Sequence, residues 1–583
     1  MAVYQINILY LCIEIHKAMF YKKGINRRQL TFFPECLDDY VSKDNPVIFF
    51  DAFVDKLDIK GLNFTHSTTE STGAPPYDPR DLIKLYIYGY FYHARSSRQL
   101  NRLCYCNIEV MWLINKLCPD FHTIANFRKD NVEGLKKVFK EFNRFCLKLN
   151  LFSKSYISVD GSKFKAVNSK DRNFTLDKLD DRIEHIDNKI EEYLELLKRS
   201  DEGIENEDAY YKELSEKLAA LKGRKAIYEG YHKYMTEHGK TQLSLTDPEA
   251  KLMKQNQGFS VCYNVQTAVD AGSHLIVGYS VTDNPTDHGE MTSISREVKN
   301  DLELSSLSAT ADNGYEDSHE YPEMLYSGII PQVITKNRTD EITIDIEYSP
   351  TEIDNKVTES TDYDSLKKCL QAGVVPKVYE GVLEVNDIVE IKKYSQPPEH
   401  LEVQMMNQEE KKKKAQEGYL IRDPELNVVY CPQGQTLYLY TERKNGEMVF
   451  CNKSACKKCL HKCTSSIYRR VFFNKDSIVK IVKDYNEGDD PERLKNTANT
   501  KGRKLEGSKK MVRYKLKLNK EIMADRKCLS EHPFGTIKRT LGQYYFLLKG
   551  SNNVSAEMAI SCLSYNLRRA INLVGVPNML KAL

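Results

Sequence analysis

The chain lacks the features that direct a protein across or into a membrane. No run of apolar residues is long enough to span a bilayer. The opening segment, Met1 to Phe20, has no basic start and no small-residue cleavage site, and Glu14 and His16 interrupt its apolar stretches. The 15 cysteines are scattered, apart from one cluster, without a secretory pattern. We therefore expect a cytoplasmic protein with reduced thiols and no membrane partner.

The chain also has little net charge. Its 85 Lys and Arg residues nearly cancel its 82 Asp and Glu residues and leave a net charge of +3, so total charge predicts no partner. With 41% hydrophobic residues the chain can bury real cores, which excludes a disordered protein. Its 583 residues are too many for one core, and we expect roughly two to four domains.

The charge is unevenly distributed along the chain. Residues 498–520 hold many bases and few acids, namely Lys501, Arg503, Lys504, Lys509, Lys510, Arg513, Lys515, Lys517 and Lys520. A run of bases near a catalytic acid, such as the Glu531 considered next, suggests contact with the phosphate backbone of a nucleic acid. The alternative is a solvated, charged loop.

Three acidic residues occupy informative positions. Asp160 and Asp312 each end an apolar, strand-like run, and Glu531 precedes a Pro-Phe-Gly turn and the basic pair Lys538–Arg539 on a segment expected to become a helix. If the two strands are neighbours in one sheet, both aspartates emerge at one edge, and Glu531 approaches from the helix. Carboxylates are hard oxygen ligands, so the set predicts a site for two Mg²⁺ or Mn²⁺ ions, ~3.5–4 Å apart, that transfers phosphoryl groups.

Basic residues flank the last acid. Lys538 lies seven residues after Glu531, about two helical turns, so it falls on the same helix face and can hold a phosphate near the metals. Arg526 and Lys527 can do the same from the other side. The alternative is that each acid is a turn former or helix cap and that Lys538 is a surface base.

Other polar residues are secondary candidates for the site. Asp270 lies at a predicted hairpin tip, and Asp283 and Asp287 follow a predicted strand. Turn chemistry accounts for each of these acids. His288 could be catalytic, although an exposed position at a helix start explains it as well.

Residues 24–150 predict a small all-helical domain. One helix is expected to start near Pro79, a second after a Ser cap near Ser96, and a third near Asp120. Four arginines would suit this domain to DNA binding: Arg95, Arg98, Arg102 and Arg128. The alternative is an ordinary helical bundle whose arginines face water.

Residues 151–171 and 241–337 predict an α/β core that is interrupted by an insertion. Strand-like runs include Phe259–Val269 and His274–Val281, which a hairpin turn separates. In the insertion, residues 172–240, apolar positions recur in alternating steps of three and four, stop at an acidic break, and then resume. This pattern predicts an antiparallel helical hairpin.

Residues 338–515 predict a second insertion. Its first part, residues 338–425, is polar and is expected to be loop-rich or partly disordered. Farther on, the two-residue spacing between Cys456 and Cys459 suits a structural Zn²⁺ site. Four of five cysteines would bind the ion: Cys431, Cys451, Cys456, Cys459 and Cys463. The alternative is a group of free thiols. Residues 516–583, which carry Glu531, are expected to form helices at 522–549 and 553–573.

Seven short motifs occur in a fixed order. They are Tyr88-Gly89-Tyr90, Arg95-Ser96-Ser97-Arg98, Pro119–Arg128, Val159-Asp160-Gly161-Ser162-Lys163, Tyr263–Asp270, Ala311-Asp312-Asn313-Gly314-Tyr315 and Glu531–Lys538. Together they resemble bacterial insertion-sequence transposases of the DDE class, in the branch with a DUF772-like helical N-terminal domain and a cysteine cluster before the last acid. The likeness covers most of the chain, from near residue 24 to near residue 573.

The resemblance implies an α/β fold with a ribonuclease-H-like mixed-sheet core, in which Asp160, Asp312 and Glu531 bind the catalytic metals. It also implies binding to double-stranded DNA at terminal inverted repeats and at the target, strand cleavage, strand transfer, and a homodimer on paired ends. Two alternatives stay open: a nuclease of this type without strand transfer, and a DNA-binding derivative with a dead catalytic core.

The chain departs from the family pattern in two places. Lys527 and Ala524 stand where the family has Arg and Tyr before the last acid, and Arg526 is one residue from the expected position, whereas Lys538 matches the expected Lys. The segment before Met19 has no counterpart in the family, which makes Met19 an alternative start.

Overall fold

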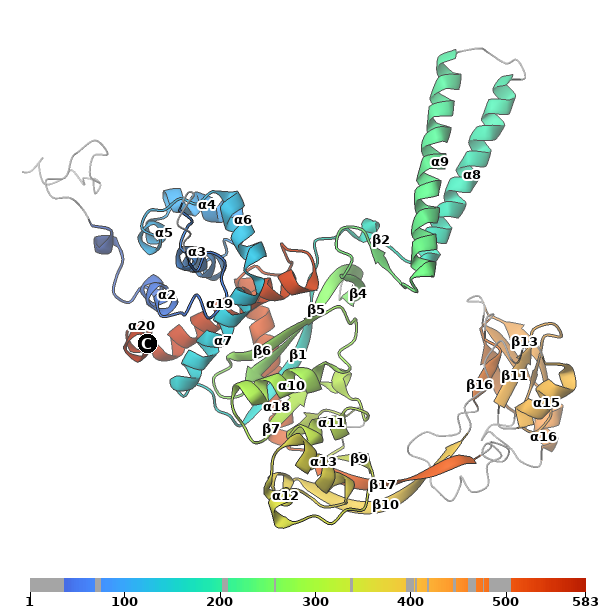
Figure 1. Ribbon diagram of the computed structural model, residues 1–583. Coiled ribbons are helices and arrows are strands. Elements are labelled where there is room, and N and C mark those ends of the chain that lie inside the picture. The colour runs from blue at the N-terminus through green and yellow to red at the C-terminus, as the bar shows by residue number, and fades with distance from the viewer. Residues whose placement is uncertain are drawn as a thin grey trace, which may run out of the picture. The chain divides into compact units, whose positions relative to one another are not determined.

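The chain divides into two units in the computed structural model (Figure 1). Unit 1 comprises Met1–Leu302 and Asp525–Leu583, and unit 2 comprises Glu303–Ala524. The structure describes residues 36–68, 75–201, 208–255, 258–335, 339–394, 403, 406–416, 419–443, 447–459, 468–474, 477–481 and 505–583. The alternative start at Met19, residues 24–35 of the predicted helical domain, Cys463, and the basic residues Lys501, Arg503 and Lys504 lie outside these residues. Every helix in the described ranges is too short or too polar to pass through a bilayer.

Side-chain caps set the start of several helices near the beginning of unit 1. Helix α3 (Pro79–Phe91) follows Asp78, α4 (Ser97–Cys106) follows Ser96, and α6 (Phe121–Asp130) follows Asp120, and each capping oxygen accepts a backbone N–H of the first turn. The three helix starts predicted from the sequence are confirmed. The other elements of this set are η1 (Leu37–Tyr40), α2 (Pro46–Asp55), α5 (Ile108–Leu113) and α7 (Val132–Lys148).

The sheet of unit 1 is organised around its longest strand, β5 (Gly258–Asp270). Strand β1 (Tyr156–Lys165) pairs antiparallel with one edge of β5, while β4 (Lys251–Gln255) and β6 (Ile276–Thr282) pair with successive parts of the other edge. Helix α10 (Glu290–Asp301) packs closely on this sheet at Gly278, where a Cβ atom would lie 2.6 Å from Val298.

Asp160 lies inside β1, not at its end as the sequence predicts. The strand continues to Lys165, with Asp160 opposite Thr267 and Lys165 opposite Cys262. It continues because β5 is long enough to supply backbone partners for the polar residues after Asp160, and this pairing outweighs the turn tendency of Asp160-Gly161.

The insertion at residues 172–240 forms two long helices, α8 (Leu176–Asp201) and α9 (Asp208–Glu237). They run antiparallel side by side (Figure 1). Near the base of the pair, Phe174, Leu179 and Met235 form a buried cluster beside the short pairing of β2 (Asn173–Phe174) with β3 (Leu243–Ser244). η2 (Lys170–Arg172) precedes β2. The two helices therefore pack on each other within one chain.

The end of the chain is helical over different ranges from those predicted. Helix α18 (Lys520–Gly535) continues through Pro533, a π-helical turn follows at Thr536–Thr540, and α19 (Ser551–Val574) and α20 (Val576–Ala582) come last. The predicted Pro-Phe-Gly turn is wrong, because these residues remain helical. The predicted helix up to residue 549 is also wrong, because residues 541–550 form a loop that bridges to Lys165 of β1 through Tyr545.

Helix α19 is the central helix of unit 1. It contacts α3 and α7 on the one hand and β6 on the other, and most of its residues from Val554 to Leu567 are buried. Two acids from the segment before β4 cap its start: Asp247 accepts the Gly550 N–H at 3.2 Å, and Glu249 accepts the Ser551 N–H at 2.8 Å.

Unit 2 contains two regions of regular structure besides the part that carries the cysteine cluster. Strand β7 (Leu307–Ala311) pairs in parallel with β8 (Ile329–Val333), with η3 (Asn313–Tyr315) and α11 (Tyr321–Tyr326) between them. A second sheet has the order β10 (Leu383–Tyr394), β17 (Leu505–Lys517), β9 (Glu341–Glu347). The helices near it are α12 (Asn355–Glu359), α13 (Tyr363–Gln371) and η4 (Lys377–Tyr379).

The prediction that residues 338–425 are loop-rich is wrong for the described residues of this range. In β9, Ile342, Ile344 and Ile346 are buried while the alternate charged and polar residues face outward. This alternation has the period of a strand with one solvated face. The prediction missed the strand because it considered only the overall polarity of the segment, which is high owing to its acids.

The cysteine-containing part of unit 2 is a small sheet with the order β15 (Arg470–Phe473), β14 (Met448–Cys451), β13 (Thr436–Glu442), β12 (Val428–Tyr430), β11 (Tyr419–Asp423), β16 (Val479–Ile481). Helices α15 (Gln408–Gln416) and α16 (Lys453–Lys458) belong to it. Its apolar side chains form two buried clusters, one around Phe450 and Phe473 and the other around Tyr419 and Tyr430.

Candidate active site around Asp160 and Lys538

Asp160 is presented on one face of β1, near the middle of that strand. Its side chain is half-buried, and its Oδ1 accepts the Gly161 N–H at 2.9 Å. Because strand side chains alternate, Ser162 and Phe164 lie on the same face as Asp160. This face of β1 is the one that the C-terminal segment approaches.

Helix α18 meets β1 at two points that bracket the acids. The Tyr156 hydroxyl donates to Asp525 Oδ2 at 3.3 Å, and the rings of Phe164 and Phe534 lie with their centroids 6.1 Å apart. Asp160 lies between Tyr156 and Phe164 on β1, and Glu531 lies between Asp525 and Phe534 on α18. Glu531 is exposed and precedes the buried Phe534 by three residues, so it stands at the border of the helix face that packs on the sheet.

Lys538 connects the C-terminal segment directly to the strand of Asp160. From the π-helical turn, its Nζ donates to Ser162 Oγ at 2.6 Å and to the Lys163 carbonyl at 2.9 Å, and it lies 4.4 Å from the centroid of the Phe164 ring. A residue far along the chain from Asp160 therefore lies beside it in space.

Burial lowers the pKa of Lys538 to about 8. The nearby Cys262 and Asp160 side chains oppose this change, because negative charge favours the ammonium form. The result places an amine with an unusually low proton affinity next to the Asp160 carboxylate, a combination that occurs often at functional sites.

Asp312 lies in unit 2, directly after β7 ends at Ala311, as the sequence predicts. Its Oδ1 accepts the Gly314 N–H at 2.9 Å and caps η3. Asp160 and Glu531 belong to unit 1, so the convergence of all three acids stays a prediction. In the described part of the chain, no three His, Cys, Asp or Glu side chains gather into a metal-binding group. The chemistry of the three carboxylates still fits a hard divalent cation, because they supply only oxygen ligands.

Arg95 and Arg128, which the sequence suggests for DNA binding, are buried and have structural partners. Arg95 is 6% exposed, donates to the carbonyls of Tyr545 and Gly542, and lies 3.6 Å from Glu557. Arg128 is 5% exposed and donates to the Tyr90 hydroxyl. A guanidinium without access to solvent cannot meet a DNA phosphate, so in this conformation both arginines hold unit 1 together.

The remaining candidates for DNA binding lie nearer the surface. Four are exposed: Arg98, Arg102, Lys527 and Arg539. Arg526 is half-buried. The guanidinium carbon of Arg98 lies 5.2 Å from the centroid of the Phe121 ring. The N–H donors of this exposed guanidinium stay at the surface.

The basic run 498–520 lies partly on β17, where acids of neighbouring strands pair with its charges. Lys509 meets Glu347 at 3.0 Å, and Arg513 meets Asp345 in a two-point contact at 2.8 Å. Lys515, Lys517 and Lys520 likewise meet Glu341, Glu384 and Asp340. These described bases are therefore paired with acids of the same protein. This arrangement supports a solvated, charged face and not a phosphate-binding surface.

The cysteines of the small sheet have different environments. Cys431 and Cys451 are buried, and Cys456 packs against the apolar cluster that contains Cys431. Cys459 directly follows α16, and its N–H donates to the Cys456 carbonyl at 3.4 Å, a backbone bond that closes the last turn of the helix. No disulfide joins the described cysteines, and zinc binding stays a prediction because Cys463 lies outside them.

The secondary acidic candidates have structural partners. Asp270 accepts hydrogen bonds from Ser153, Gly272 and Ser273, which fixes the turn between β5 and β6. Asp287 accepts from the side-chain amides of Asn264 and Gln266. The contacts of Asp270 match the turn role that the sequence offers as the alternative, whereas Asp287 is held by two side chains of β5.

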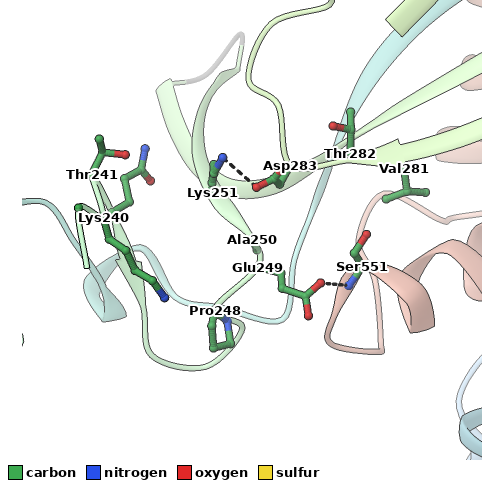
Figure 2. A pocket seen from close by; sticks show the side chains of 12 residues that line it. Lys240, Thr241, Pro248, Glu249, Ala250, Lys251, Val281, Thr282, Asp283 and Ser551 are labelled. Carbon is green, nitrogen blue, oxygen red and sulfur yellow. Dashed lines mark hydrogen bonds and ion pairs between the residues drawn. The ribbon is translucent and has the colours of Figure 1, made fainter. Parts of the chain in front are cut away.

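The third of these acids, Asp283, lines a pocket of about 650 Å³ at the base of the helical hairpin. Figure 2 shows its ion pair with Lys251, at 2.8 Å, and the contact of Glu249 with the Ser551 N–H. The acids of this pocket are therefore engaged with a base and with the start of α19. The pocket is lined by none of the three candidate catalytic acids.

Ser162 of the site and Glu557, the partner of Arg95, have no assigned role in the sequence predictions. Ser162 holds Lys538, and its position two residues after Asp160 on a strand is the signal that could have found it. Glu557 faces Arg95 from a helix near the other end of the chain, and no local pattern marks that pair.

The N-terminal helices match a known family. Residues 35–130 match a family model described as a transposase domain (DUF772). No curated protein and no solved structure matches the chain. The family match covers helices α2 to α6 and supports a transposase role in general, and it ends before the strands that lead to Asp160 and Asp312.

Proposed function

We propose that this chain is an insertion-sequence transposase of the DDE type. It would bind the terminal inverted repeats of its element in double-stranded DNA, cleave DNA strands, and join the ends to a target. The observation that carries the proposal is the contact of Lys538 with Ser162 and the Lys163 carbonyl, since it brings the segment after Glu531 to the strand of Asp160. The transposase-domain match supports the same role.

In this proposal Asp160, Asp312 and Glu531 hold two Mg²⁺ or Mn²⁺ ions. When bound, such ions activate the attacking oxygen and stabilise the leaving oxygen of a phosphodiester. The backbone of the half-buried Asp160 is paired with β5 on both sides of the residue, and its Oδ1 accepts the Gly161 N–H at 2.9 Å. Glu531, at the exposed border of α18, is accessible to a bound DNA strand.

Lys538 would position the phosphate that reacts. An ammonium group has three N–H donors, and two of them are used in the contacts with Ser162 and Lys163. The third can donate to a phosphate oxygen, and the negative charge of DNA would raise the pKa of Lys538 again and keep it charged. Arg526, Lys527 and Arg539 are proposed to bind the flanking phosphates.

DNA recognition is proposed for the N-terminal helices through Arg98 and Arg102. Both are exposed on α4, whereas Arg95 and Arg128 of the same region are not accessible. Pairing of two element ends would require two copies of the chain, so we propose a homodimer on paired ends. We further propose that four of Cys431, Cys451, Cys456, Cys459 and Cys463 bind a structural Zn²⁺ ion.

The proposal is tested with the full chain and a duplex that carries the repeats flanking its coding region. Asp160→Asn, Asp312→Asn and Glu531→Gln should each reduce Mg²⁺-dependent cleavage to below about one hundredth of the wild-type rate, since even indirect partners of a metal cost 10–100-fold when removed. DNA binding should persist in all three. Asp283→Asn is the matched control, because it removes an acid whose side chain is 49% exposed and which lies outside the proposed site.

The outcomes separate the alternatives. Full activity of any one variant removes that residue from the site. Cleavage without joined products would indicate a nuclease of this type, and DNA binding without cleavage by the wild-type chain in Mg²⁺ or Mn²⁺ would indicate a derivative with a dead core.

A further inference from the structure

One face of the small sheet in unit 2 carries a cluster of aromatic and basic side chains. We call it the tyrosine face and define it by Tyr438, Tyr440, Lys453, Tyr468 and Arg470. Tyr438 is 58% exposed and Tyr440 is 55% exposed. Large aromatic side chains normally bury most of their surface, so two on one strand with more than half of their surface in water call for an explanation.

The fold of β13 and β14 produces this exposure. Leu437 of β13 is buried in the apolar cluster with Phe450, whereas Tyr438, the next residue, points to the opposite side. A bulge in the pairing between Leu439 and Thr441 then displaces Tyr440 from the regular register. The two tyrosines are two positions apart on one strand, roughly 7 Å, and offer two neighbouring rings.

Two cations contact the rings of Tyr440 and Tyr468. Lys453 Nζ lies 5.2 Å from the ring centroids of both Tyr440 and Tyr468. Arg470 lies 6.0 Å from the Tyr440 ring and 5.4 Å from the Tyr468 ring, and it donates to the Tyr468 hydroxyl at 2.7 Å. Cation–π contacts of this kind orient the rings without covering them, because Tyr440 stays more than half exposed.

We propose that the tyrosine face binds single-stranded nucleic acid, with unpaired bases stacked on Tyr438 and Tyr440 and the phosphates near Lys453 and Arg470. Stacking on aromatic side chains combined with nearby positive charge is how proteins bind single strands without reading their sequence. A paired base in a duplex has both faces covered by its neighbours, so the surface selects unpaired DNA or RNA.

The charge of the surroundings favours this partner over an apolar peptide or a cationic one. Lys457 and Lys458 of α16 are exposed near Lys453 along the chain, and no member of the tyrosine face is acidic. Of the acids along this hairpin, Glu442 follows Tyr440 by two positions and Glu447 pairs with Arg443 at 2.8 Å. Near the Tyr440 ring, one acid therefore stands against the two cations Lys453 and Arg470.

The inference goes beyond the proposed function and does not depend on the three acids. A transposase that separates or exposes strand ends would supply unpaired bases, but the binding itself requires only the small sheet. The two readouts are therefore separate: cleavage tests the three acids, and the single-strand affinity of the tyrosine variants tests the tyrosine face, so failure of this inference is distinct from failure of the catalytic proposal.

The experiment measures binding of the full chain to a fluorescent oligothymidine of about 20 nucleotides, long enough to cover one such site, and to a duplex of the same length. Tyr438→Ala and Tyr440→Ala should each weaken binding of the single strand about 5- to 100-fold, as expected for loss of one stacked base, and leave duplex binding unchanged. Tyr440→Phe should keep the affinity, because the ring and not the hydroxyl makes the contact.

The charges have a separate readout. Lys453→Ala should reduce the slope of log K against log salt for the single strand by about 0.7, the value for one lost phosphate contact. Leu426→Ala, which truncates another exposed side chain of the same small sheet, is the control and should change neither affinity nor slope. Circular dichroism and thermal unfolding check that all variants are folded.

Three results would overturn the inference. The first is unchanged single-strand affinity in the Tyr438→Ala/Tyr440→Ala double variant. The second is an equal loss of duplex and single-strand binding in that variant, which would indicate a general effect. The third is loss of binding in Tyr440→Phe to the same extent as in Tyr440→Ala.

Discussion

Replacing Arg95 by Ala distinguishes a structural role of this residue from a DNA-binding one. Arg95 and Glu557 are almost fully buried, with 7% and 1% of their side chains exposed, and their charged groups lie 3.6 Å apart. Glu557 also accepts the backbone N–H groups of Leu547 and Leu548, so it is fixed where it is. Removing the arginine would leave this carboxylate buried without its cation.

The expected cost is about 3–5 kcal/mol, the range measured when one partner of a buried ion pair is removed. Arg95→Ala also loses two hydrogen bonds to carbonyl oxygens, at 2.9 and 3.4 Å, and the stacking on Tyr545. These losses are already part of that range, because contacts that share one side chain are not additive. With about 2 °C or more per kcal/mol for a large domain, the thermal midpoint of unit 1 should fall by at least roughly 6 °C.

The assay is thermal unfolding together with DNA binding, and Arg98→Ala is the matched control. Arg98 lies three residues away and is exposed, so its removal should change stability by no more than about 0.5 kcal/mol while it weakens DNA binding. The double variant Arg95→Met/Glu557→Gln should recover stability relative to Arg95→Ala, since the Gln side chain carries no charge and can still accept the Leu547 and Leu548 N–H groups. An Arg95→Ala chain that unfolds like the wild type but has lost DNA affinity would refute the reasoning.

Two other predictions concern Lys538 and zinc. The pKa of Lys538 is about 8 in the folded chain and near 10.5 when unfolded, so between these pH values the unfolded chain binds more protons, and this lysine makes folding more favourable as pH rises. Between pH 7.5 and pH 10 the thermal midpoint of the wild type should therefore rise relative to that of Lys538→Met. A difference between the two midpoints that stays constant with pH would contradict the lowered pKa. If the cysteines of the small sheet bind zinc, elemental analysis of the chain purified without chelator should find about one ion per chain, as a four-cysteine site requires. Cys456→Ser/Cys459→Ser should lose the ion, because only three of the five cysteines remain, and Cys146→Ser should keep it; a chain that never contains zinc would reject the site.

The parts of the fold that depend on local chemistry were predictable from the sequence. Asp78-Pro79, Ser96 and Asp120 start helices because their side chains satisfy backbone N–H groups within a few residues, and this signal is complete in the sequence. Asp312 at the end of β7 is a similar case, because a short apolar run and a following turn mark the end of the strand.

Features that depend on distant partners could not be predicted. The extent of β1 beyond Asp160 is set by the length of β5, which lies about a hundred residues later. The burial of Arg95 depends on Tyr545, 450 residues away, so its neighbours in sequence give no warning. The acids that neutralise the bases of β17 come from β9 and β10, and a count of charges along residues 498–520 does not include them.

The central position of α19 has a consequence for the order of events during synthesis. The helices that emerge first from the ribosome pack against α19, and Arg95 and Arg568 make contacts across this boundary, the latter with the carbonyl of Phe91 at 3.0 Å. At ordinary elongation rates the nascent chain needs on the order of tens of seconds to travel the 450 residues that separate Arg95 from Tyr545. For that interval the early helices expose the surface meant for α19, and a ribosome that stalls in unit 2 leaves them without it. Completion of the polypeptide, rather than emergence of its first domain, is then the event that makes the N-terminal region native.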